Sequence, residues 1–206
     1  MQQFPIQGYN LVQLEELVTP GKQALDMQAV PQPLYDTQTY VNATTQELTF
    51  FTTAAAGGDW LTNMEVAGQL PNPDFFVIQY MTMDIIGLPP GDEDNLLDYY
   101  RLLFGTGVLG APYVSARLKS KDYGPWPLSY LNGTGGPTGF TTRTAVEYAN
   151  NGVPGQAGVW IGGAIVIPPL VSWSMRMRWS APVTLAKGAN VQLRLNLEGT
   201  RYRSIS

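Results

Sequence analysis

The side chains that most often carry out acid–base and nucleophilic chemistry are missing from this chain. Its 206 residues include no histidine and no cysteine, which removes the commonest general base, thiolate nucleophiles, disulfides and cysteine zinc sites. Chemistry with two carboxylates, as in glycoside hydrolysis, needs neither residue. Asp84, Asp122 and Glu147 could form such a pair, yet nothing in their spacing singles one out. We therefore predict no catalytic residue, no cofactor and no metal site, and we expect that the protein is not an enzyme.

Two other patterns could bind ligands, and each has a simpler explanation. Asp92, Glu93 and Asp94 are acidic neighbours, but they lack the glycine and the distal glutamate of an EF-hand loop. They precede a segment with helical spacing, where acidic side chains stabilise the helix N-terminus. The glycines of residues 131–142 are not followed by the Lys-Ser/Thr of a phosphate-binding loop. We interpret the first pattern as the start of a helix and the second as a connection.

Arginines alternate with apolar residues in two late segments of the chain. In "VSWSMRMRWS", residues 171–180, Arg176 and Arg178 share one parity with three serines, and the other parity is entirely apolar. In "NVQLRLNLEG", residues 190–199, Arg194 and Glu198 lie opposite a valine and three leucines. Such alternation predicts antiparallel strands with one face in a core and one face in water.

The arginines of these strands are candidates for an assembly interface. Arg176, Arg178 and Arg194 on adjacent exposed faces, with Glu198 as the one carboxylate beside them, would repel one another. Something outside the sheet is expected to neutralise them, such as the acidic half of a neighbouring copy, an anionic polymer or a membrane surface. With Arg201 and Arg203 from the carboxyl-terminal "TRYRSIS", they form the predicted interface.

Composition and charge narrow the class of protein. With 44% hydrophobic and 14% charged residues, 22 Gly and 16 Pro, the chain is typical of a globular protein rich in strands and turns. Residues 1–100 hold 13 acidic residues and one lysine (net −12), whereas residues 101–206 hold 3 acidic and 11 basic residues (net +8). The two halves either interleave in one domain or meet between neighbouring copies. No signal peptide or long apolar span occurs, so we expect synthesis in the cytosol.

The elements that must position these residues can be placed along the chain. Residues 1–33 predict an extended arm, and residues 34–206 a single domain. Strands are expected from Glu47, over 75–87 with both faces buried, over 113–123, over 159–167 and in the two arginine segments. Residues 61–71 predict a short helical turn, and residues 91–105 predict the best helix of the chain.

The order of these segments resembles a known family. The late segment "IVIPPLVSWSMRMRWSAPVTLAKGANVQLRLNLEGTRYRSI" resembles the carboxyl-terminal strands of jelly-roll capsid proteins of tailless icosahedral bacteriophages, including the membrane-containing type. "LYDTQTYVNATTQELTFFTT" and "LTNMEVAGQLPNPDFFVIQYMTMDI" are similar to the first core strands of such proteins. The resemblance covers residues 34–205. It implies an all-β fold, a single jelly-roll β-sandwich or barrel with one short helix in a connection and an extended N-terminal arm.

The resemblance also implies a function and a set of partners. A capsid subunit, here the major one, self-assembles into an icosahedral shell and resides in the virion after synthesis in the host cytoplasm. Its partners would be copies of itself, other capsid proteins of the same virion, and an internal membrane or the packaged genome, with no small-molecule substrate. The alternative is a carbohydrate-binding β-sandwich that uses Trp60, Trp126, Trp160 or Trp179 as a sugar platform.

Overall fold

The chain is mostly β-strands arranged in two antiparallel sheets. The computed structural model describes residues 27–56, 60–86, 93–105, 112–131 and 159–204. Within these residues the helical elements are α2, Glu93–Phe104, and a short 3-10 helix, η2, Leu128–Tyr130. None of the described helices is long and apolar enough to cross a membrane. The predicted fold class, all-β with one short helix in a connection, is confirmed for the described residues.

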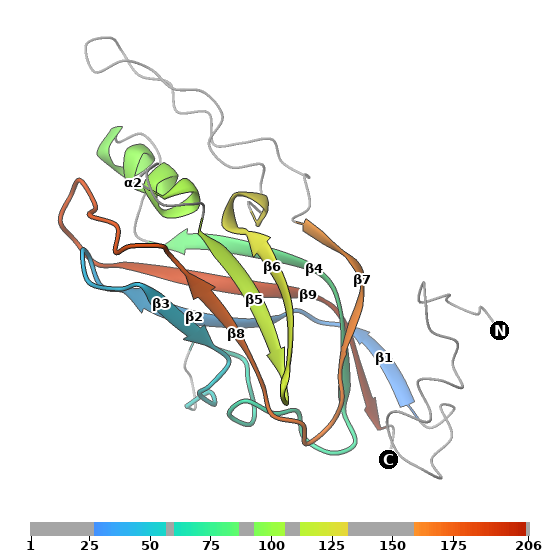
Figure 1. Ribbon diagram of the computed structural model, residues 1–206. Coiled ribbons are helices and arrows are strands. Elements are labelled where there is room, and N and C mark those ends of the chain that lie inside the picture. The colour runs from blue at the N-terminus through green and yellow to red at the C-terminus, as the bar shows by residue number, and fades with distance from the viewer. Residues whose placement is uncertain (1–26, 57–59, 87–92, 106–111, 132–158, 205–206) are drawn as a thin grey trace.

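Figure 1 shows the two sheets lying face to face. The first has the order β1-β9-β4-β7, and β2 also pairs with β9, in line with β1 along the same edge. The second has the order β3-β8-β5-β6. The strands are β1 Met27–Pro31, β2 Leu34–Tyr40, β3 Glu47–Phe50, β4 Phe75–Ile86, β5 Tyr113–Leu118, β6 Lys121–Pro127, β7 Val159–Ile167, β8 Trp173–Arg178 and β9 Val191–Ser204.

The strands from β2 to β9 pair as a nested set. The outermost pair is β2 with β9, followed inward by β3 with β8, β4 with β7, and β5 with β6, all antiparallel. The chain therefore runs as one long hairpin that turns between β5 and β6. Two further pairings, β4 with β9 and β5 with β8, join the folded hairpin into two sheets.

The core lies between the sheets and follows the predicted alternation. β8 and β9 each place every second side chain in the core, with exposed fractions of 4% or less. The helix α2 closes one end of this core through Leu102 and Leu103, which are fully buried. Gly105 follows the helix with a positive φ, and its N–H bonds the Arg101 carbonyl as a C-terminal cap. The core residues of the two strands are Trp173, Met175, Met177, Val191, Leu193, Leu195 and Leu197.

A register shift explains the mixed pattern of β4. Phe76 and Ile78 face the core, the pairing shifts between Ile78 and Tyr80, and Met81 and Met83 then continue on the core side. One inserted residue thus moves the core set from even to odd positions, as a β-bulge does. The expectation of burial on both faces holds only for residues 75–78, because Gln79, Tyr80 and Asp84 are exposed.

Three expectations about individual segments differ from the structure. Residues 61–71 form bends and isolated bridges, not a helical turn. Residues 113–123 form β5, a turn at Lys119-Ser120 and the start of β6, not one strand. β1 lies within the expected arm of residues 1–33 but pairs with β9, while residues 1–26 lie outside the described residues. The glycine connection at 132–142 and Glu147 also lie outside them.

A buried carboxylate ties the first sheet to the second. Asp36 of β2 is 1% exposed, and its Oδ2 accepts hydrogen bonds from the Phe51 N–H at 2.6 Å and from Gln38 Nε2 at 3.0 Å. Phe51 follows β3 with a φ of 66°, which bulky residues rarely adopt. Burial raises the pKa of Asp36 above its ordinary value of 3.8, and the hydrogen bonds lower it in part.

The substitution Asp36→Asn is expected to change how stability depends on pH. The raised pKa means that the folded chain holds this proton more tightly than the unfolded chain. The free energy of unfolding therefore falls as pH rises from 3.8 through the folded-state pKa, and the cost of the buried charge is fully present above that window. An asparagine side chain cannot titrate but keeps an oxygen for the Phe51 N–H. Urea unfolding should show wild type gaining stability relative to the variant as pH falls toward 3.8. A difference independent of pH would contradict the prediction.

Candidate assembly surfaces

The outer face of the second sheet carries three arginines. Because Trp173, Met175 and Met177 fill the core side of β8, its alternate residues, Arg176 and Arg178 among them, lie on the outer face. The strand register places Arg178 between Glu47 and Tyr113, and Arg176 between Thr49 and Ser115. Arg117 of β5 lies opposite Ser174. Arg117 is thus a diagonal neighbour of Arg176 that the sequence prediction did not include.

The carboxylates on this face are not shared evenly among the arginines. Arg178 Nε lies 2.7 Å from Glu47 Oε2, and Arg117 Nε lies 4.0 Å from Asp122 Oδ1. Arg176, half-buried between them, has no ion pair with any carboxylate of the described residues. Hydroxyl-bearing Thr49 and Ser115 flank it instead. Arg176 is therefore the residue of this face that best fits the prediction of an externally neutralised arginine.

Arg194 lies on the outer face of the other sheet. The expectation that Arg176, Arg178 and Arg194 occupy adjacent exposed faces is wrong, because β8 and β9 belong to different sheets. The Arg194 guanidinium stacks on Tyr35 and Trp60, with Cζ 4.8 and 5.1 Å from the ring centroids. It also donates to Thr37 Oγ1 at 3.1 Å and to the Trp60 carbonyl at 3.0 Å. Its charge is held by aromatic and polar groups of its own chain.

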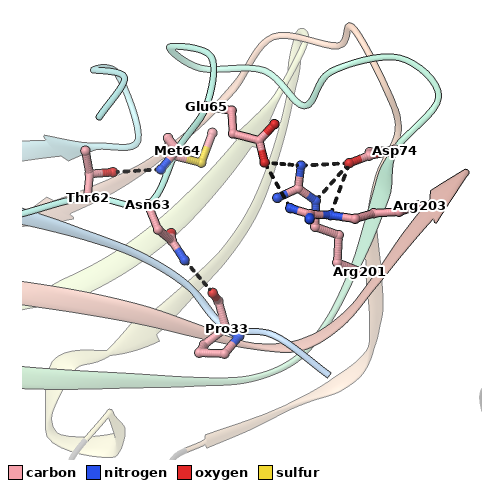
Figure 2. A network of polar contacts seen from close by, with 8 residues as sticks. All are labelled: Pro33, Thr62, Asn63, Met64, Glu65, Asp74, Arg201 and Arg203. Carbon is pink, nitrogen blue, oxygen red and sulfur yellow. Dashed lines mark hydrogen bonds and ion pairs between the residues drawn. The ribbon is translucent and has the colours of Figure 1, made fainter. Parts of the chain in front are cut away.

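Arg201 and Arg203 form an ion cluster with Glu65 and Asp74 (Figure 2). Arg201 donates to Asp74 Oδ2 through Nε at 3.0 Å and Nη2 at 2.7 Å, and its Nη2 lies 2.8 Å from Glu65 Oε1. Arg203 Nη2 lies 2.9 Å from the same Glu65 oxygen. Only 2% of Arg201 is exposed. This burial corrects the prediction of an interface role for Arg201, whereas Arg203, 39% exposed in its side chain, stays a candidate.

The described tryptophans and carboxylates of the alternative hypotheses lie on different elements, whereas the Trp160 side chain and Glu147 lie outside the described part of the chain. Trp179 is buried, with its Nε1 donating to the Leu102 carbonyl at 2.9 Å, so it cannot serve as a sugar platform. Trp126 packs against the core, and Trp60 is 53% exposed. Asp84 lies on β4 and Asp122 on β6, in different sheets. Among the described residues, no group of three acidic side chains could hold a metal ion.

The odd or even position of each arginine along β9 indicates which face of the sheet it occupies. Arg201 and Arg203 share the parity of the core leucines of β9, whereas Arg194 has the opposite parity. Continuing the alternation would have placed Arg201 on the inner face. Glu65 and Asp74 belong to an irregular connection more than a hundred positions away, and nothing local predicts their pairing with β9.

Comparison with known proteins finds no relative of this chain, so the function must be inferred from the geometry described above. No protein-family model matches the chain. Searches of the curated proteins and of the solved structures give no match either.

Proposed function

We propose that this protein is a viral structural protein, the main capsid subunit of an icosahedral shell, built on a single jelly-roll domain. The observation that carries the proposal is the strand order. The order β2-β9-β4-β7 faces β3-β8-β5-β6, with four nested antiparallel pairs. Eight strands in two sheets connected in this way are typical of jelly rolls, a fold used by viral capsid and lectin domains. The family resemblance of residues 34–205 favours the capsid among these uses.

The outer face of the second sheet supports an assembly role. It presents a half-buried arginine whose charge no carboxylate of the described chain balances, on regular strands that hold it in place. Complementary charge between neighbouring subunits fixes their register and excludes wrong partners. A neighbouring copy with an acidic patch, or another capsid protein of the same virion, would supply the missing partner for Arg176.

Assembly can be measured directly on the purified chain. We expect light scattering after size exclusion to show discrete oligomers or shell-sized particles whose mass grows with protein concentration. The variant Arg176→Glu should raise the concentration needed for assembly about tenfold or more, because a reversed charge would face its former partner. Circular dichroism should show that the variant remains folded.

A charge swap supplies the matched control. Arg178→Glu combined with Glu47→Arg keeps an ion pair and the net charge of the face, because the two residues are 2.7 Å apart and in register. Because Arg178 is already paired within its own chain, we expect this double variant to assemble as wild type does. Weaker assembly would show that Arg178 contacts the neighbouring subunit directly. A strict monomer at high concentration in both low and high salt would refute the capsid function and direct the next test to glycan binding at Trp60. Unchanged assembly of Arg176→Glu would remove Arg176 from the interface.

A further inference from the structure

Three connections meet at the end of the sandwich opposite α2 (Figure 1). They are residues 51–56 and 60–74 between β3 and β4, the turn between β5 and β6, and residues 168–172 between β7 and β8. Backbone hydrogen bonds join them: Leu170 N–H to Leu70 O at 3.0 Å, Trp173 N–H to Gly68 O at 2.9 Å, and Lys119 N–H to Ser172 O at 2.9 Å. The three connections therefore form one ordered surface, called here the loop end.

An apolar side chain projects from the loop end on a strained backbone. Leu170 is 63% exposed and has a φ of 56°, which bulky residues rarely adopt. Its side chain gains little from burial in its own chain, so core packing does not account for a leucine at this position. Val66, also exposed at 41%, lies in the neighbouring connection. Backbone outliers of this kind gather at sites that bind other molecules.

Two lysines lie at or next to the turn whose Lys119 N–H bonds the connection that carries Leu170. Lys119, in the β5–β6 turn, and Lys121, at the start of β6, are exposed, and neither forms an ion pair within the described part of the chain. Two nearby acidic residues of the described chain have basic partners of their own: Asp122 lies 4.0 Å from Arg117, and Glu65 pairs with two arginines. The loop end thus offers free cationic charge beside exposed apolar side chains.

We propose that the loop end binds an anionic lipid surface. Apolar side chains that enter the headgroup region, flanked by lysines that attract anionic lipids, are the two components of peripheral membrane binding. A protein partner is disfavoured because lysine is depleted at protein interfaces. The inference rests on the proposed function for its biological meaning, because it orients the subunit with residues 168–172 toward a lipid layer beneath the shell.

Flotation with vesicles tests the inference on the full chain. Wild type should float with vesicles of phosphatidylglycerol and phosphatidylcholine in equal parts, and much less with phosphatidylcholine alone. Leu170→Asn should weaken binding about tenfold, the effect of losing one buried aliphatic side chain. Asparagine accepts the left-handed backbone, so the variant should unfold at the same or a higher urea concentration. Lys119→Asn with Lys121→Gln should cost about fivefold for each lysine.

Val41 provides the matched control. It is 42% exposed in the connection between β2 and β3, where the Ala43 N–H bonds the Val183 carbonyl. The next residue, Thr184, accepts a hydrogen bond from Arg101 of α2, so this connection lies at the opposite end of the sandwich (Figure 1). Val41→Asn should float as wild type does. Equal flotation of Leu170→Asn and wild type, or no flotation of wild type, would overturn the inference. If Leu170→Asn instead changed oligomer mass without lipid, the partner would be protein, and the inference would also fail.

The two proposals fail in distinguishable ways. Particles that assemble but do not bind vesicles would refute lipid binding and leave the capsid function intact. A chain that binds vesicles through Leu170 but stays monomeric in every condition would refute the shell function and leave the lipid-binding site standing.

Discussion

Replacing Arg201 with methionine is expected to lower the free energy of unfolding by about 3–5 kcal/mol, the range for removing one partner of a buried ion pair. The Asp74 side chain is 12% exposed and receives two hydrogen bonds from Arg201. Without them its charge would keep only the more distant Arg203 Nε at 3.6 Å. Urea unfolding at neutral pH measures the loss.

The exposed pair of Arg178 and Glu47 is a matched control for this prediction. Its N–O distance, 2.7 Å, equals that between Arg201 Nη2 and Asp74 Oδ2, but its two side chains are 51% and 38% exposed. Arg178→Met should therefore cost less than about 1 kcal/mol. Equal losses for Arg178→Met and Arg201→Met would show that burial does not determine the effect.

A double variant separates the ion pair from packing. Arg201→Met with Asp74→Leu removes both buried charges and should recover most of the stability that either single variant loses, because apolar pairs often replace buried ion pairs without cost. If the double variant lost the sum of the two single effects, the residues would act independently. That result would contradict the cluster drawn in Figure 2.

The ion cluster also matters for the loop end. Glu65 and Asp74 belong to the connection of residues 51–74, whereas Arg201 and Arg203 belong to β9. The cluster therefore fastens an irregular segment to the longest strand of the sandwich. Val66 directly follows Glu65, so the same ion cluster fixes its position. We expect Arg201→Met to weaken vesicle binding only to the extent that it increases the unfolded fraction of the protein. Leu170→Asn should instead weaken vesicle binding while the protein remains folded.

Much of the fold could be predicted where one face of a strand fills the core. The expected strand at 159–167 has the bounds of β7. β8 lies within the first arginine segment, and β9 begins in the second but continues beyond it to Ser204. The helix α2 also lies within its predicted residues. In β8 and in the first half of β9 apolar side chains recur at every second position and are buried there, so burial and local sequence agree.

The remaining strands carry weaker local signals. β6 contains Gly124, Pro125 and Pro127, and it is tolerated because it forms the edge of its sheet. β2 places Asp36 among core residues, which interrupts its apolar pattern. The candidate assembly surface was predicted only in part, because parity can show which face a side chain occupies but not which strand lies beside it. The ion partners of Arg178 and Arg201 come from elements that only the folded chain brings together.

Gly199→Ala is the second substitution with a large expected effect. Gly199 of β9 pairs with Ile78 beside the register shift of β4. A Cβ at this position would overlap the Val77 carbonyl oxygen and would lie 2.9 Å from both the Val77 carbonyl carbon and Phe76 Cζ. The oxygen belongs to the backbone of a central strand, so relief requires moving β4 away from β9. We expect a loss of about 3 kcal/mol or more in the free energy of unfolding, at the upper end of overpacking effects.

The control for this substitution is a glycine with strain but without overlap. Gly188 has a φ of 68°, and a Cβ there would meet only Asn42 Nδ2 at 3.9 Å. Gly188→Ala should cost about 1–2 kcal/mol, from the left-handed backbone alone. Urea unfolding of both variants ranks the two effects. If Gly199→Ala were as stable as Gly188→Ala, the close approach of β4 and β9 would be wrong, and with it the register that places Arg201 beside Phe76 and inside the sandwich.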